Sequence, residues 1–186
     1  MNRVMVDIET YATEFDKNGR GPQILQIGAA YSRHGIVEDE ELFLVSIADV
    51  EDPEYYSSMK TRDWWAKQSK EAQESLHMNL VAGTAEALLA FNRWLDGIRF
   101  NKGIPKWTIW ANPPQFDLTF LQFAYTKEQI ELPWHFRQER CCRTIWNELP
   151  QVPVEYPEGL VAHRADHDAV RQLVGIEAAL MHIQGY

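Results

Sequence analysis

Two carboxylates stand one residue apart near the start of the chain, at the end of a short apolar run. The segment VMVDIETYA covers residues 4–12 and carries Asp7 and Glu9. Because residues i and i+2 of a strand point to the same face, these carboxylates lie roughly 6–7 Å apart and repel each other unless a cation sits between them. A solvated strand end is the alternative. The apolar residues before the pair favour the end of a central strand, where ligands bind in open α/β sheets.

Three more side chains could complete such a site. Asp117 falls in the first turn of a predicted helix, where the helix dipole alone also favours an acid. His163 and Asp168 stand five residues apart around the start of the last predicted helix, so both can face one pocket. His163 could instead be a capping or surface residue. His163 and His167 have an i, i+4 spacing that suits zinc, but no Glu follows the first histidine as in metalloproteases.

The chemistry that these residue types favour is phosphodiester hydrolysis. Four acids without clustered cysteines or histidines favour hard cations, Mg²⁺ or Mn²⁺, over zinc. Two such ions, roughly 3.5–4 Å apart, can hold both oxygens of an in-line phosphoryl displacement. A neutral histidine can accept the proton of the attacking water. The complete set of parts is Asp7, Glu9, Asp117, Asp168 and His163.

The elements that must position these residues follow from the hydrophobic pattern. Strands are predicted at 3–8, 24–32, 40–46 and 106–111, and helices at 61–78, 84–98, 116–126 and 164–183. Thr61 and Thr84 are the predicted N-caps. Short links between the first three strands predict an antiparallel meander. Residues 133–149 could form a loop, a short strand or a helix. The chain therefore predicts one α/β domain, residues 1–186, with a mixed five-stranded sheet flanked by helices.

Composition narrows the class of protein. A hydrophobic fraction of 45% predicts a packed core, and a net charge of −9 argues against broad binding to a phosphate backbone. Bound cations can still reverse the local field for a nucleic-acid enzyme. No apolar run is long enough for a membrane span, and no signal peptide fits the N-terminus. Cys141 and Cys142 are adjacent and make no disulfide framework, so we expect a cytoplasmic protein.

Four segments together resemble a known family. VDIET resembles a first motif Asp-x-Glu-Thr, ILQIGAAY the strand that follows it, WANPPQFDLTFL a second motif, and HRADHDA a third. In order and spacing they are similar to the DEDDh 3′–5′ exonucleases of the ribonuclease H-like fold, over residues 4–170. TRDWWAKQSKEAQ further resembles a small phage and bacterial exoribonuclease-like subgroup. Gln26 and His167 depart from the residues common in relatives, and neither departure removes a ligand.

The resemblance implies a role for each site residue. Asp7 would bridge two metal ions, Glu9 and Asp168 would complete the shell of the first, and Asp117 would reach the second. His163 would be the general base. The residues expected to border the terminal nucleotide, or to stack on bases, are Ile8, Thr10, Phe116, Trp64 and Trp65. For the two tryptophans and the phenylalanine, packing in the core is the alternative.

The function that the sequence predicts is a metal-dependent 3′–5′ exonuclease that releases nucleoside 5′-monophosphates from single-stranded ends. RNA is slightly favoured over DNA, because an acidic surface suits a short substrate. The alternatives are an exodeoxyribonuclease acting on single-stranded DNA, an endonuclease or phosphotransferase of the same fold, and a non-catalytic nucleic-acid-binding module. Relatives commonly act as homodimers, but no segment of the sequence identifies an interface.

Overall fold

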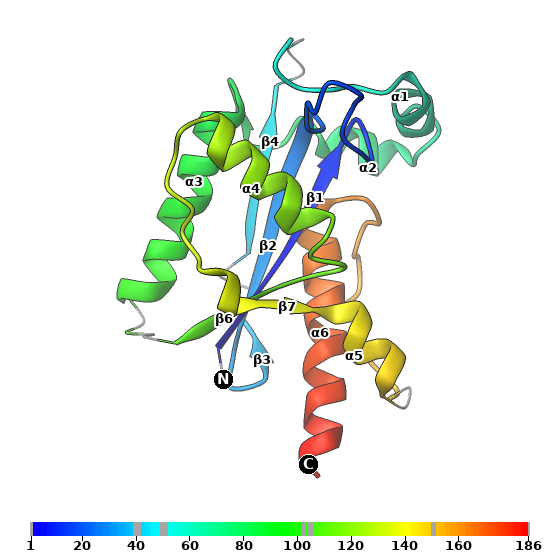
Figure 1. Ribbon diagram of the computed structural model, residues 1–186. Coiled ribbons are helices and arrows are strands. Elements are labelled where there is room, and N and C mark those ends of the chain that lie inside the picture. The colour runs from blue at the N-terminus through cyan, green and yellow to red at the C-terminus, as the bar shows by residue number, and fades with distance from the viewer. Residues whose placement is uncertain are drawn as a thin grey trace.

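A mixed β-sheet with helices on both faces forms the centre of the molecule (Figure 1). The computed structural model describes residues 2–38, 42–48, 52–101, 103, 106–149 and 152–185. The sheet has seven strands in these ranges: β1 Asn2–Thr10, β2 Ile24–Arg33, β3 Ile36–Val37, β4 Phe43–Ile47, β5 Leu80–Val81, β6 Trp107–Ala111 and β7 Glu139–Cys141.

The strand order is β5-β4-β2-β1-β6-β7, with β3 paired to β2. β1 and β4 both run antiparallel to β2, which confirms the predicted meander. β6 is parallel to β1, and β7 is parallel to β6. Because parallel strands end at the same edge of a sheet, the carboxyl ends of β1, β6 and β7 come together, and the segments that follow them meet there.

The mixed sheet flanked by helices matches the prediction, but the predicted number of five strands was wrong. β3 and β5 have two residues each, which is too short to produce an alternating pattern in the sequence. The strand predicted at 40–46 is β4, Phe43–Ile47. Residues 40 and 41 of that prediction lie outside the described residues.

Six α-helices are described: α1 Met59–Trp65, α2 Lys70–Ser75, α3 Thr84–Asp96, α4 Asp117–Lys127, α5 Cys142–Glu148 and α6 Ala165–Gln184. A π-helical turn, η2 (Gly97–Asn101), continues α3, and a 3₁₀ turn, η3 (Phe136–Gln138), precedes β7. The ambiguous segment 133–149 thus contains a turn, a short strand and a helix.

The single helix predicted at 61–78 is two helices. The Ser69 hydroxyl accepts a hydrogen bond from the Ala72 amide at 3.1 Å and caps α2, so the chain starts a new helix there. The predicted cap at Thr61 was wrong, because α1 begins two residues earlier, after Ser58. Thr84 is likewise the first residue of α3 rather than its N-cap.

The alternation of side chains along β1 decides what each face of the sheet meets. Val4, Val6 and Ile8 pack into a core with α3 and α4. Met5 points to the other face and packs against α6. Asp7 and Glu9 lie two and four residues after Met5, so their side chains point to the same face of the sheet and also face α6. The two faces therefore separate the larger apolar core from the acidic pair.

Two contacts fix α6 against the sheet. At its N-terminal end, a Cβ on Gly28 would lie 2.1 Å from the carbonyl carbon of Ala165, so only glycine permits this approach. Further along, Arg3 and Glu177 form a buried ion pair at 2.7 Å, and the Ser32 hydroxyl also donates to Glu177. The helix is thereby held near both ends of β1, since Gly28 pairs with Asp7 and Arg3 lies at the start of the strand.

Two further features of the described residues are the absence of a membrane-spanning helix and the state of the two cysteines. In the part of the chain that the structure describes, no helix has the length and apolar character needed to cross a membrane. Cys141 and Cys142 are both free thiols, and Cys142 is buried against Met5.

Candidate active site

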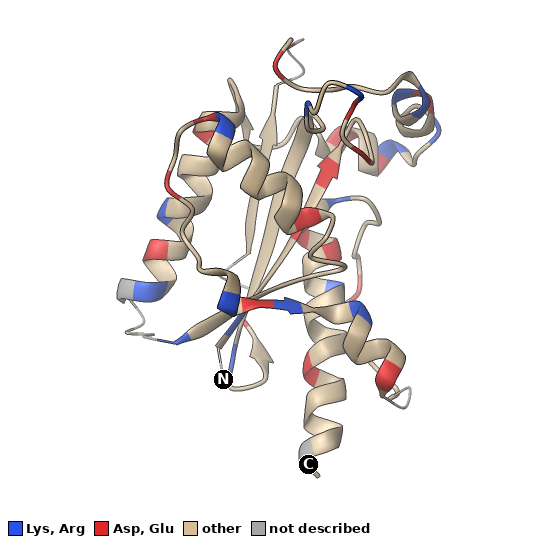
Figure 2. Ribbon diagram, in the orientation of Figure 1, with Lys and Arg blue, Asp and Glu red and all other residues tan. Residues whose placement is uncertain are grey.

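Carboxylates from three elements meet at the carboxyl end of β1. Asp7 and Glu9 belong to β1, Asp117 begins α4, and Asp168 lies in the first turn of α6. Figure 2 shows acidic positions at the end of β1, the start of α4 and the start of α6. The backbone amide of Ile8 donates to Asp117 Oδ1 at 3.1 Å, which ties the start of α4 directly to the acidic strand end.

His163 lies on the loop just before α6 and faces the acidic pair of β1. Its amide donates to Asp168 Oδ2 at 2.8 Å, and its ring Nδ1 lies 3.8 Å from Glu9 Oε1. One ligand atom from each of Glu9, His163 and Asp168 lies within 4.8 Å of the others. His163 has a φ of 61°, a left-handed conformation that is uncommon for residues other than glycine and that clusters at functional sites.

Burial raises the pKa of all four carboxyl groups, and neighbouring carboxylates raise those of Asp7 and Glu9 further. Burial is the largest cause for Asp7, followed by the charges of Asp117, Glu9 and Asp168. Burial and the charges of Asp168 and Asp117 raise the pKa of Glu9 to about 8. Burial raises the pKa of Asp117 to about 7, against an opposing hydrogen bond from the Ile8 amide and the nearby charge of Arg143. The site is therefore short of positive charge, as expected of a group of acids built around a cation.

The donor atoms at this site fit a hard divalent cation. Carboxylate oxygens from Asp7, Glu9, Asp117 and Asp168 are the ligands that Mg²⁺ and Mn²⁺ prefer. His167 is not part of the cluster with Glu9, because its Nδ1 accepts a hydrogen bond from the Val161 amide at 2.8 Å. His167, the second histidine of the spacing considered for zinc, thus holds the loop before α6.

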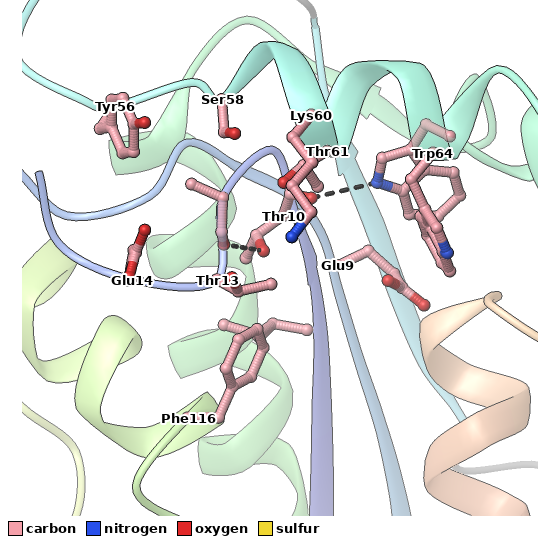
Figure 3. Close-up of a pocket in the computed structure, with 13 residues that line it drawn as sticks. Glu9, Thr10, Thr13, Glu14, Tyr56, Ser58, Lys60, Thr61, Trp64 and Phe116 are labelled. Carbon is pink, nitrogen blue, oxygen red and sulfur yellow. Dashed lines mark hydrogen bonds between the residues drawn. The ribbon is translucent and has the colours of Figure 1, made fainter.

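A pocket of about 310 Å³ opens beside the carboxylates (Figure 3). Its walls come from the end of β1, the loop that follows, α1 and the residue before α4. Phe116 lies across the pocket from Lys60 and Thr61. All the predicted substrate-contacting residues line it: Ile8, Thr10, Phe116, Trp64 and Trp65. Its volume is within the range of small-molecule sites in proteins.

The two tryptophans of the pocket differ in their surroundings. Trp65 is 4% exposed, and its Nε1 donates to the Thr10 carbonyl at 3.0 Å. Trp65 therefore mainly supports the end of β1. Trp64 is 41% exposed and contacts the His163 ring edge-on, with ring centroids 4.8 Å apart. Trp64 is therefore the tryptophan with surface free to meet a ligand.

Sequence reasoning missed Gln172 as a member of the site. This buried side chain donates from Nε2 to Asp7 Oδ1 at 2.7 Å. Gln172 follows Asp168 by four residues, so both lie on one face of α6. That spacing was the signal in the sequence that could have identified it.

Gln26 was noted only as a departure from the resembled family, and the structure gives it a position of its own. Its Oε1 accepts the Ala165 amide at 3.1 Å, and its Nε2 donates to the Ser75 carbonyl at 2.7 Å. The fully buried Gln26 therefore joins the start of α6 to the end of α2. Through α6 it helps to set the position of Asp168.

This sheet topology, with acids converging at the end of β1, gives the chain a ribonuclease H-like fold, which it shares with the nuclease domain of 3′hExo, a DEDDh family member. A family model described as the 3′-5′ exoribonuclease Rv2179c-like domain matches residues 2–180. The chain belongs to this family, which confirms the resemblance seen in its motifs. No similar sequence was found among curated proteins.

Solved structures of nucleases share the fold at low sequence identity. Cell-death related nuclease 4 (CRN-4) matches 99% of this chain with a TM-score of 0.67 and 15% identity, over 64% of its own length. The nuclease domain of 3′hExo, a DEDDh family member bound to rAMP, matches 99% with a TM-score of 0.65 and 12% identity, over 92% of its length. The zinc-bound E. coli ExoI–ssDNA complex matches 99% with a TM-score of 0.62 and 14% identity, over 41% of its length. The chain thus spans less than two thirds of CRN-4 and of ExoI.

Proposed function

We propose that residues 1–186 form one exonuclease domain that removes nucleoside 5′-monophosphates, one at a time, from single-stranded 3′ ends. The observation that carries this proposal is the convergence of four carboxylates and His163 beside a pocket of about 310 Å³. RNA is the favoured substrate, because the matching family is described as an exoribonuclease domain. Single-stranded DNA is the competing substrate.

Two divalent cations, Mg²⁺ or Mn²⁺, would activate the attacking water and stabilise the departing 3′ oxygen. We assign Asp7 to bridge them, Glu9 and Asp168 to complete the shell of one, and Asp117 to reach the other. The raised pKa values of Glu9 and Asp117 support this assignment, since burial disfavours their ionised forms and a bound cation would favour them. Gln172 supports it as well, because its hydrogen bond holds one Asp7 oxygen in a fixed direction.

His163 is the proposed general base. It would accept the proton of the attacking water while the water oxygen bonds to phosphorus and the bond to the 3′ oxygen of the penultimate nucleotide breaks. The position of its Nδ1, 3.8 Å from Glu9, and its partly exposed ring support this role. The edge-on contact with Trp64 limits how far the ring can rotate away from the site.

The pocket is proposed to hold the terminal nucleoside. Trp64 and Phe116 offer aromatic surface on opposite sides of the Glu9–Thr10 strand end. Stacking of a base on such a side chain contributes roughly 1–3 kcal/mol and tolerates every base. A preference for single-stranded ends follows, because a base inside a duplex cannot enter the pocket without losing its partner.

The test is a digest of 5′-labelled single-stranded RNA and DNA of one sequence, with Mg²⁺ or Mn²⁺. A ladder shortening from the 3′ end, with nucleoside 5′-monophosphates as products, is expected, and RNA should be the faster substrate. Asp7→Asn should abolish the ladder, whereas Asp96→Asn, an exposed acid on α3, should not change it. Internal cuts would indicate an endonuclease, and intact substrate a binding module. Faster loss of DNA would overturn the sugar preference.

The proposal extends to assembly and location. A homodimer is proposed from the resemblance to the exonuclease family, and light scattering that gives a monomer mass at micromolar concentration would reject it. A cytoplasmic setting is proposed from the two free cysteines, Cys141 and Cys142.

A further inference from the structure

A basic side chain lies at the same sheet edge as the carboxylates, on the side away from the pocket. Arg143 stands in the first turn of α5, directly after β7. Cys141 pairs with Ala111 at the ends of β7 and β6, so α5 begins beside the segment that leads from β6 to Asp117. Figure 1 shows α5 and α1 on opposite sides of the end of β1.

A short chain of contacts joins Arg143 to the acidic site. Its Nη2 lies 3.5 Å from the Asn112 carbonyl oxygen, and the Asn112 amide donates to the Asp117 carboxylate. The charge of Arg143 acts on Asp117, and the charges of Asp117 and Asp7 reach the thiol of the adjacent Cys142. The start of α5 is therefore within electrostatic range of the four carboxylates.

Arg143 has little to hold it within the described residues. Its side chain is exposed, it forms no ion pair there, and its one hydrogen bond is at the upper limit of hydrogen-bond length. The other arginines near the site are engaged. Arg164 binds both carboxylate oxygens of Asp166, and Arg171 lies 3.7 Å from Asp168. Arg143 is thus a guanidinium with donors available for an anion.

The path of the substrate supplies such an anion. Under the proposed function, the terminal nucleoside occupies the pocket and the scissile phosphate lies over the carboxylates. The pocket is lined by the end of β1, α1 and Phe116, and no residue of α5 or of the β6–α4 loop before Phe116 lines it. The rest of the strand must therefore leave on the opposite side of the carboxylates, where α5 begins.

We propose that Arg143 binds the backbone phosphate immediately 5′ of the scissile phosphate. This inference rests on the proposed function and adds a second substrate contact, to a non-reacting phosphate of a single-stranded nucleic acid. A planar guanidinium can donate two parallel hydrogen bonds to a phosphate. In a chain of net charge −9, a local positive group also offsets the repulsion between the substrate and the acidic surface.

The test pairs a protein variant with a substrate in which one phosphate has lost its charge. Wild type and Arg143→Gln are compared on a short RNA and on the same RNA with a methylphosphonate at the linkage 5′ of the scissile one. We expect Arg143→Gln, or the methylphosphonate, to lower kcat/KM about 3- to 10-fold, mainly through KM. The two changes together should cost no more than either alone. Arg143→Lys should restore part of the loss, because it keeps the charge without the paired donors.

Controls separate this contact from a general charge effect. Arg93→Gln removes an exposed arginine on α3 and should leave kcat/KM unchanged. A methylphosphonate several linkages further along should affect wild type and Arg143→Gln equally. Mn²⁺ affinity, measured by calorimetry without substrate, should change in Arg143→Gln by less than kcat/KM does, because the exposed guanidinium acts on Asp117 but is not a metal ligand. Tighter Mn²⁺ binding by Arg143→Gln, with independent effects of variant and methylphosphonate, would mean that Arg143 only screens the carboxylates, and would overturn the proposal.

The same four combinations are also measured as equilibrium binding of labelled RNA by fluorescence anisotropy. If wild type cleaves neither substrate, the proposed function fails, and the binding cycle still decides on Arg143. Non-additive losses in binding support the phosphate contact, and additive losses reject it.

Discussion

The crowded carboxylates make the stability of the metal-free protein depend on pH in an unusual direction. An acid that gains a positive partner on folding stabilises a protein at high pH. Here burial and the charges of Asp168 and Asp117 raise the pKa of Glu9 from 4.5 to about 8, and burial raises that of Asp117 from 3.8 to about 7. The folded state therefore holds protons that the unfolded state has already released. The contribution of Glu9 to stability is complete below pH 4.5 and is lost as the pH rises towards 8, and that of Asp117 is complete below pH 3.8 and is lost as the pH rises towards 7.

The size of the effect follows from the pKa of Glu9. Between pH 5 and pH 7 its carboxyl is ionised in the unfolded chain and protonated in the fold, so its contribution falls by about 3 kcal/mol. For a protein of this length, that change corresponds to a decrease in Tm of roughly 6–12 °C. Asp117 adds a smaller decrease in stability. Its pKa in the fold is about 7, so part of its carboxyl is already ionised in the folded state at pH 7.

The assay is urea unfolding after treatment with a chelator, at several pH values from 5 to 8. We expect the free energy of unfolding of wild type to fall across this range. For Glu9→Gln the fall should be less steep by about 1.4 kcal/mol per pH unit, because one proton fewer differs between the folded and unfolded states. With saturating Mn²⁺ the trend should reverse, because the ion binds the ionised carboxylates. A metal-free wild type whose stability is flat or rises from pH 5 to pH 7 would refute the reasoning.

Three substitutions test the remaining parts of the site. His163→Ala should lower turnover about 10²- to 10⁴-fold while Mn²⁺ affinity by calorimetry is kept, and unchanged turnover would refute a general base. Gln172→Leu should weaken Mn²⁺ binding about 10- to 100-fold, because Asp7 loses the hydrogen bond that orients it, and wild-type affinity would contradict this. Gly28→Ala should destabilise the fold by about 1–3 kcal/mol or more in urea and reduce activity, since its Cβ meets the backbone of Ala165; wild-type stability would rule out that close approach.

The long periodic elements and the meander could be predicted from the sequence because their patterns are local. The break after α1 could not, since it depends on the Ser69 cap, one of several polar residues in a helical pattern. The strands β3 and β5 exist because neighbouring strands offer them hydrogen bonds, and two residues carry no periodic signal of their own. Tertiary pairing, rather than propensity, decides these elements.

The site residues could be selected from the sequence because acids at the end of an apolar strand and a histidine before a helix are visible as patterns. Their distances could not, because these depend on how α4 and α6 pack on β1. The pKa of Glu9 is an example, since it arises from burial and from Asp168, 159 positions along the chain. Arg137, Arg140 and Arg143 are visible in the sequence as a basic stretch that could contact phosphates, but only the pairing of β7 with β6 shows that Arg143 lies at this edge.

The two fixed points of α6 have a consequence for how nucleotides enter and leave. Ala165 packs on Gly28, and Glu177 is paired to Arg3, so residues 165–177, about 18 Å of helix, are held at both ends. A helix held at two points resists both sliding along the sheet and rotating about its axis. Asp168 lies between these points, so its distance from β1 stays fixed. The segment just before α6, where His163 has a left-handed backbone conformation, lies outside the part of the helix that these two contacts hold.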